Sequence, residues 1–209
     1  RLKDILVEKI PLLILSFLFI CLTFYGQKIL GAVKHSSLSL DQRIGNSFYF
    51  FCKYIFNFVF PTQLAVQYPD PQDTLSFGIK AFCFLISISL FAFFSIKRKT
   101  KPYLLLGFLW FVLSLAPYLQ IVQIGNQVVA DRWMYIPLAG LAISLAFFLE
   151  NIKTVFSVIV LIFFGTSSYL QLEHWQTIEG IFKRSVEVTE RNYRAHYYEG
   201  LSYLRQGRE

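Results

Sequence analysis

An acidic and a basic residue stand side by side at Asp131 and Arg132, just before the apolar run Met134–Leu149. An acid at the start of a helix is favourable because the helix dipole is positive there, whereas an arginine is unfavourable unless an anion joins it. Because a guanidinium fork matches phosphate oxygens, the pair predicts that Arg132 binds a phosphate and that Tyr135, one turn on, donates a hydroxyl. The alternative is an Asp–Arg pair whose arginine reaches the membrane interface.

Other cations could serve the same anion. Lys53 lies in the aromatic stretch 48–58, and an unpaired lysine in lipid costs several kcal/mol. Lys53 therefore either extends from an interfacial helix to water or contacts a phosphate. Arg43 and Lys34 share one polar loop and are candidates for a lid over that phosphate.

Few residues support other chemistry. His35 stands beside two serines without an acidic partner at a readable spacing, so no nucleophile is predicted there. A glycine-rich phosphate loop and paired carboxylates are absent from the sequence, and Cys21, Cys52 and Cys83 lack metal-ligand spacing. No metal site is predicted, although a divalent cation stays open as a cofactor.

The amino-acid composition indicates whether the chain lies in water or in a membrane. Of 209 residues, 55% are hydrophobic and 16% are charged, where soluble domains carry about 25% charged residues. A soluble protein of this size has too little interior for so many apolar residues, so most of the chain must contact membrane lipid. The net charge of +7 resides in residues 1–170. No basic stripe extends beyond Lys97–Lys101, so nucleic acid is not predicted as a partner.

Apolar runs define the expected architecture. A membrane-spanning helix needs about 20 residues, and five of the six runs approach or reach this length. The run Ser47–Phe60 is short, aromatic and interrupted by Lys53, which favours an interfacial helix. The fold predicted is an all-α membrane bundle of about five spans and one interfacial helix. The six runs are Ile10–Tyr25, Ser47–Phe60, Phe77–Ile96, Tyr103–Gln120, Met134–Leu149 and Thr154–Leu170.

Charge placement predicts the orientation. The basic connector Lys97–Lys101 should be cytoplasmic. With Ser47–Phe60 not crossing, the loops 26–46, 61–76 and 121–133 are then external, as is the polar tail. The domains expected are a transmembrane domain, 1–170, and an external tail, 171–209.

The tail has helical spacing of apolar residues, with a stripe through Trp175, Ile178, Ile181, Phe182 and Val186. Gly200, Tyr203 and Gly207 match the first helix of a tetratricopeptide repeat (TPR) in part, with Gly200 permitting close helix packing. Such a helix cannot bury its apolar face alone, so further repeats should follow. Two generic amphipathic helices are the alternative.

The stretch from Pro102 to Pro137 resembles membrane glycosyltransferases of the GT-C fold that carry C-terminal TPRs, which are similar to transmembrane O-mannosyltransferases. A Trp/Phe-rich helix, a proline and a polar loop precede the motif, and Trp133 departs from the family's usual tyrosine. Lys9-Ile10-Pro11 and Tyr68-Pro69 also resemble the family. The matching positions within the stretch are Gln123, Gly125, Ala130, Asp131, Arg132, Tyr135 and Pro137.

The resemblance implies transfer of a sugar from a polyprenyl-phosphate donor to a protein or glycan acceptor at the external face. It further implies a bacterial inner-membrane location with a periplasmic tail that binds protein partners. The family's catalytic acid belongs to an earlier external loop, so it is expected outside this chain, which alone should be inactive. The donor-phosphate candidates are Arg132, Asp131, Tyr135, Arg43 and Lys53.

Two other functions stay open. A non-enzymatic membrane scaffold would recruit proteins through external TPRs. A transporter fragment would need ionisable groups at mid-membrane, but the expected spans contain only Lys80, near an end. The sequence therefore favours the scaffold over the transporter as the alternative to the enzyme.

Overall fold

The computed structural model describes residues 2–29, 31, 38–69, 75–97, 101–122, 128–150 and 154–206. Every regular element in these ranges is a helix, and they contain no strand, as the sequence predicts. The chain forms two compact units. One unit includes α1, and the other comprises Leu38–Val122 and Gln127–Glu209.

The first unit consists, in its described part, of the long helix α1, Leu2–Ile29. Its segment Val7–Ile29 is long and apolar enough to cross a membrane. The side chains of this segment are exposed almost throughout. An apolar helix of this length is suited to lipid as its surroundings.

The second unit contains three more helices that are long and apolar enough to span. They are α3, Phe77–Lys97; α5, Tyr135–Leu149, with the 3-10 turn Asp131–Met134 before it; and α6, Thr154–His174. Together with α1, these four helices of the described ranges are consistent with an integral membrane protein.

Helix α4, Pro102–Leu115, is shorter than expected for a membrane span. A 3-10 turn, Ala116–Tyr118, follows it, and the whole apolar helix Pro102–Tyr118 falls below spanning length. The sequence suggested that 103–120 was one of the two best spans. The helix stops early because Pro117 has no N–H to continue the hydrogen-bond ladder. Gln120 then takes a left-handed φ of 61°.

Helices α4 and α5 pack closely against each other. A Cβ built on Gly107 would lie 2.5 Å from the Gly140 carbonyl oxygen, so only glycine allows this approach. Ser144 Oγ donates to Leu104 O at 3.0 Å. Nearer the C-terminal end of α5, Lys101 Nζ donates to Phe147 O at 2.8 Å. Small residues and polar contacts of this kind hold helices together in lipid, where the hydrophobic effect does not.

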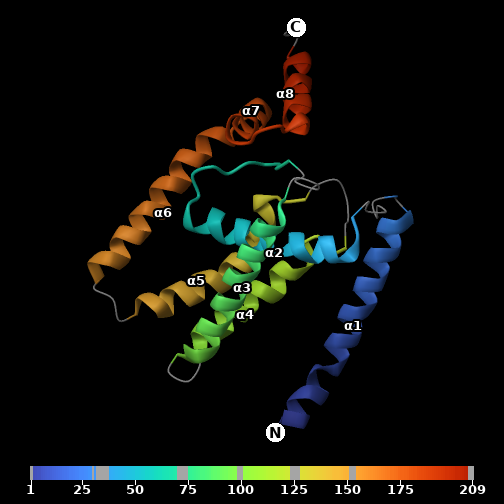
Figure 1. Ribbon diagram of the computed structural model, residues 1–209, viewed down its shortest axis with the longest axis vertical. Coiled ribbons are helices and arrows are strands. Elements are labelled where there is room, and N and C mark those ends of the chain that lie inside the picture. Colours follow the sequence, from blue (N-terminus) through green and yellow to red (C-terminus); the bar gives the residue numbers. More distant parts are fainter. Residues whose placement is uncertain are drawn as a thin grey trace. The chain divides into compact units, whose positions relative to one another are not determined.

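Helix α2, Leu40–Val59, is amphipathic, and although its 20 residues are enough to span, it is not apolar enough for a span. This agrees with the prediction for 47–60. Its aromatic face is buried, and Phe51 lies 5.5 Å from the Phe111 ring of α4. Cys52 Sγ donates to Cys83 O of α3 at 3.6 Å. Figure 1 shows α2 running across the direction of α3 and α4.

The tail forms a hairpin of α7, Ile178–Val188, and α8, Tyr193–Arg205. Phe182 and Tyr198 stack across it, with ring centroids 5.0 Å apart. Trp175 lies in the turn before α7, and α6 continues past the expected boundary at 170 to His174. The structure does not show a TPR. A Cβ on Gly200 would meet nothing within 4 Å among the described residues, and Gly207 lies outside them.

Candidate functional site

The Asp131 carboxylate, at the start of the α5 span, collects hydrogen bonds from two other segments. Asn57 Nδ2 of α2 donates to Oδ1 at 2.9 Å. Tyr68 OH donates to Oδ2 at 2.9 Å, and the backbone N–H of Ala65 donates to the same oxygen at 3.0 Å. All three donor residues are buried. One carboxylate thus joins α2, the segment 61–68 and α5.

The local sequence explains how these groups meet. Helix α2 ends at Val59, two residues before Pro61, so the chain leaves the helix and turns back in 61–68. Asn57 is in the last turn of α2, and its Nδ2 also donates to Tyr68 OH at 2.9 Å. Tyr68 OH in turn accepts from Ala65 N at 3.2 Å. The tyrosine hydroxyl and the carboxylate therefore fix the fold of the segment together.

Lys53 lies one turn before Asn57 on α2. Its Nζ is 5.2 Å from the Tyr68 ring centroid and 5.8 Å from that of Phe56, within the range of cation–π contact. Burial lowers the pKa of Lys53, and the charge of Asp131 partly opposes this shift. Two aromatic faces and a nearby carboxylate thus support an ammonium group that is partly removed from water.

Two tyrosine hydroxyls complete the polar contacts around Asp131. Tyr54 is fully buried, and its hydroxyl accepts from Ala130 N at 3.3 Å, directly before Asp131. Burial is the main cause that raises the pKa of both Tyr54 and Tyr68 above the usual 10.0, and Asp131 adds to both shifts. Tyr68 therefore keeps the proton that it donates to Asp131.

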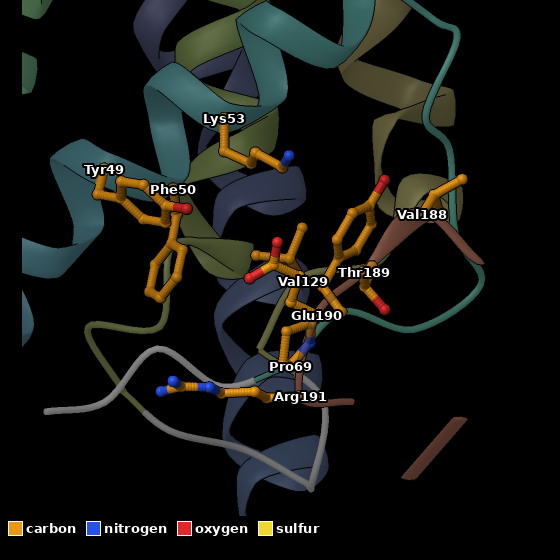
Figure 2. A pocket seen from close by; sticks show the side chains of 10 residues that line it. Tyr49, Phe50, Lys53, Pro69, Val129, Val188, Thr189, Glu190 and Arg191 are labelled. Carbon is orange, nitrogen blue, oxygen red and sulfur yellow. The ribbon is translucent and has the colours of Figure 1, made fainter. Parts of the chain in front are cut away.

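A cavity of about 470 Å³ lies in front of Lys53. Figure 2 shows the lysine side chain entering it from α2, with Arg191 on the opposite side. This volume is typical of small-molecule sites. Ten residues from distant parts of the unit line it, three of them aromatic and three charged. They are Tyr49, Phe50, Lys53, Tyr68, Pro69, Val129, Val188, Thr189, Glu190 and Arg191.

Asp131 also lines a second, more apolar hollow of about 250 Å³. Its wall includes Leu138 of α5 and Phe164 of α6, which both belong to apolar spans. A neighbouring hollow of about 290 Å³ shares Pro61, Leu64 and Ser168 with it and reaches Trp175. The two form one groove, called the α6 groove below, along the segment 61–64.

The structure brings together two of the predicted site residues, Asp131 and Lys53. Arg132 is exposed, with its guanidinium carbon 5.9 Å from the Trp133 ring, and Tyr135 is 86% exposed. Arg43 Nη1 donates to Ile121 O at 2.9 Å. Arg43 lies ten residues before Lys53 on α2, which is about 15 Å along the helix. The candidates Lys34 and His35, and the motif residues Gln123 and Gly125, lie outside the described residues.

Sequence reasoning did not identify Asn57, Tyr68, Glu190 or Arg191 as site residues. The sequence did offer a way to find Asn57, because this residue follows Lys53 by four positions and so lies on the same helix face. The described residues contain no cluster of three or more His, Cys, Asp or Glu that could hold a metal ion. Because three donors already engage the oxygens of Asp131, the arrangement is better suited to binding an anion than to proton transfer. No family model, curated protein or solved structure matches the chain.

Proposed function

We propose that this chain is the donor-binding part of an integral-membrane glycosyltransferase. It binds a polyprenyl-phosphate-linked sugar at the external, periplasmic face, for transfer to a protein or glycan acceptor. The observation that carries the proposal is the Lys53 ammonium, supported by Tyr68 and Asp131, in front of a cavity of about 470 Å³.

The proposed chemistry follows from the charge of the leaving group. When the sugar departs, negative charge grows on the phosphate oxygen, and a fixed cation stabilises that state. Lys53 is such a cation. Arg132 and Tyr135 stay proposed as further phosphate contacts, and Arg43 as part of a lid. The general base comes from another part of the protein, as the resemblance to GT-C enzymes implies.

The α6 groove supports a lipid-linked donor. It joins the polar residues Asn57 and Asp131 to apolar side chains of α5 and α6. A polyprenyl phosphate has the same character, with a charged head and an apolar chain. The proposed topology has five crossing helices, namely α1, α3, α5 and α6 and, as a short fifth crossing packed against α5, α4 with the 3-10 turn that follows it. Helix α2 lies at the interface and the tail on the side of the cavity.

Binding of a short isoprenyl-phosphate hexose to the full-length protein in lipid nanodiscs tests the proposal. We expect Lys53→Gln to weaken binding about tenfold or more, because a hydrogen bond to a charged group contributes about 1.5–3 kcal/mol. Lys183→Gln, on the exposed side of α7, is the matched control and should bind as the unaltered protein does. Normal binding by a folded Lys53→Gln protein would refute the proposed site.

Arg132 is tested in the same assay. Arg132→Ala should weaken donor binding and transfer more than it lowers the amount of folded protein. Arg132→Lys should restore only part, because one ammonium does not reproduce the bidentate fork. Undiminished donor binding by Arg132→Ala would remove Arg132 from the site.

The scaffold is a second candidate, favoured by the outer surface of the hairpin. Tyr193, Tyr197 and Leu204 of α8 are exposed, and the space beside Gly200 is open in the described structure. We propose that a further helix pair of a TPR array stacks there and contributes to a protein-binding surface. If transfer needs none of the cavity residues while partner binding needs α8, the scaffold replaces the enzyme.

A further inference from the structure

The cavity in front of Lys53 has a second charged wall, which comes from the tail. The turn between α7 and α8 places Thr189, Glu190 and Arg191 on it (Figure 2). We propose that this turn recognises the phosphorylated sugar headgroup, with Arg191 as a second phosphate-binding cation and Glu190 as an acceptor for sugar hydroxyls. The inference rests on the proposed function and adds residues that the sequence analysis placed in a separate domain.

The turn is held rigidly. Asn192 is buried, and its Nδ2 donates to Gln67 O at 2.8 Å and to Thr189 Oγ1 at 2.9 Å. Its Oδ1 accepts from Ala195 N at 3.1 Å and so caps α8. Arg191 takes a φ of 54°, in the left-handed backbone region that residues other than glycine rarely adopt. Backbone of this kind persists where its surroundings fix it, and it is concentrated at ligand sites.

The hairpin is also fixed to the segment that holds the Asp131 network. Val66 N donates to Ser185 Oγ at 3.2 Å, and Arg184 Nη2 donates to Thr62 O at 2.7 Å. Ser185 is fully buried at this contact. The segment 61–68 therefore carries the hairpin on one side and is bonded to Asp131 on the other. The Lys53 wall and the Arg191 wall are positioned by the same piece of chain.

Three charged side chains line the cavity without neutralising one another. Among the described residues, Lys53, Glu190 and Arg191 form no ion pair within 4.0 Å and no side-chain hydrogen bond. Charges that served only the fold would gain from pairing with one another. A cavity with two cations and one carboxylate held apart instead fits a ligand that carries both an anion and hydroxyl groups.

The aromatic residues of the cavity wall indicate which class of ligand fits the cavity. Tyr49, Phe50 and Tyr68 present ring surfaces beside the charged groups. A sugar ring offers C–H faces that pack on aromatic rings, and its hydroxyls donate to a carboxylate. A phosphate offers oxygens to an ammonium and a guanidinium. A sugar phosphate satisfies all these groups, whereas a bare lipid phosphate leaves Glu190 without a partner.

The test uses full-length protein in nanodiscs and three probes: isoprenyl phosphate, isoprenyl-phosphate hexose and soluble hexose 1-phosphate. Arg191→Gln should weaken binding of each phosphorylated probe that the unaltered protein binds by about tenfold. Glu190→Gln should weaken binding of sugar-bearing probes and leave isoprenyl phosphate unchanged or bound more tightly. Arg194→Gln is the matched control and should change no affinity, because Tyr193 is the one hydrogen-bond and cation–π partner of this α8 arginine among the described residues.

Arg191→Gly separates folding from binding. Glycine adopts the left-handed φ without strain, so this variant should melt at or above the temperature of the unaltered protein and still lose affinity. If Arg191→Gly and Arg191→Gln both bind normally while Lys53→Gln does not, the turn is not part of the site and the proposed function stands. If only soluble hexose 1-phosphate binds, and Arg191 and Glu190 matter, the headgroup assignment stands and the lipid-linked donor fails. Equal effects of Glu190→Gln on all probes would overturn the sugar contact.

Discussion

Replacing Asp131 with asparagine tests whether one carboxylate holds the site together. The change preserves size and removes charge and one acceptor. Donors approach both oxygens, Asn57 on Oδ1 and Tyr68 with Ala65 on Oδ2. Either orientation of the new amide therefore sets its NH2 group against at least one donor. Asn57 can rotate its own amide to adapt, but it then loses its bond to Tyr68.

The expected cost follows from these contacts. A hydrogen bond to a charged group contributes about 1.5–3 kcal/mol, and a buried donor left without a partner costs about 1–3 kcal/mol. With one or two of the three bonds lost or weakened, Asp131→Asn should destabilise the protein by about 2–4 kcal/mol. For a chain of this length that corresponds to a fall in melting temperature of about 5–15 °C. Asp131→Ala should cost more, because it removes all three hydrogen bonds to the carboxylate.

A thiol-reactive fluorophore provides the assay. Cys83 is only 6% exposed, and burial, with a further contribution from Cys83, raises the pKa of Cys52 to about 12. Both thiols should stay unreactive near neutral pH until the protein unfolds. Cys21 is exposed on α1 and is replaced by alanine in every protein compared, so that the signal reports the second unit.

The control is Glu173→Gln, an exposed carboxylate near the end of α6. It should shift stability by no more than about 0.5 kcal/mol. If Asp131→Asn melts within that margin of the reference protein, the three hydrogen bonds do not stabilise the fold and the account of the site is wrong. If both variants lose stability equally, loss of negative charge is the cause rather than the hydrogen bonds.

Two further predictions concern helix packing and charge. Gly140→Ala should strongly destabilise the α4–α5 pair, because the new Cβ would lie 2.8 Å from Phe111 N and still closer to Gly107 O. The control is Gly165→Ala, whose new Cβ would meet nothing within 4 Å among the described residues. In the same melting assay this control should be neutral or slightly stabilising. Phosphate-probe binding should weaken as pH rises through the pKa of Lys53, which burial sets below the usual 10.5, since only the ammonium form attracts the anion. Lys53→Arg, whose guanidinium stays charged, should abolish this pH dependence; a profile that persists in Lys53→Arg would assign it to another group.

The sequence predicted the helical membrane class well because apolar length is a local property. Four of the expected runs appear as helices long enough to span, and the aromatic run around Lys53 is amphipathic, as its polar interruptions indicated. The exception is 103–120. Hydropathy averaged along the sequence counts the apolar residues of this run and does not take account of Pro117. The missing N–H of Pro117 decides where α4 ends.

The site could be predicted only in part because its contacts join distant segments. Asp131 was identified from its place before a span, but Asn57 and Tyr68 are 74 and 63 residues away in sequence. The periodic spacing of residues along a helix does not predict contacts between residues so far apart in the sequence. Arg191 was missed for a different reason. The charge-balanced tail is typical of a separate domain, and its hydrogen bonds to 61–68, among them those of Asn192 and Ser185, bring the turn between α7 and α8 to the cavity.

Stability alone does not explain a carboxylate at position 131. Replacing both partners of a buried hydrogen bond with apolar groups of the same shape can be nearly neutral or stabilising, so Asn57, Tyr68 and Asp131 could in principle give way to a purely apolar contact. That exchange would still leave Ala65 N–H without its acceptor, and it would remove the negative charge near Lys53. Burial beside Phe56 and Tyr68 lowers the pKa of Lys53, and the charge of Asp131 partly offsets this shift. The network is therefore best understood as the means by which the fold keeps a positive charge at the cavity wall.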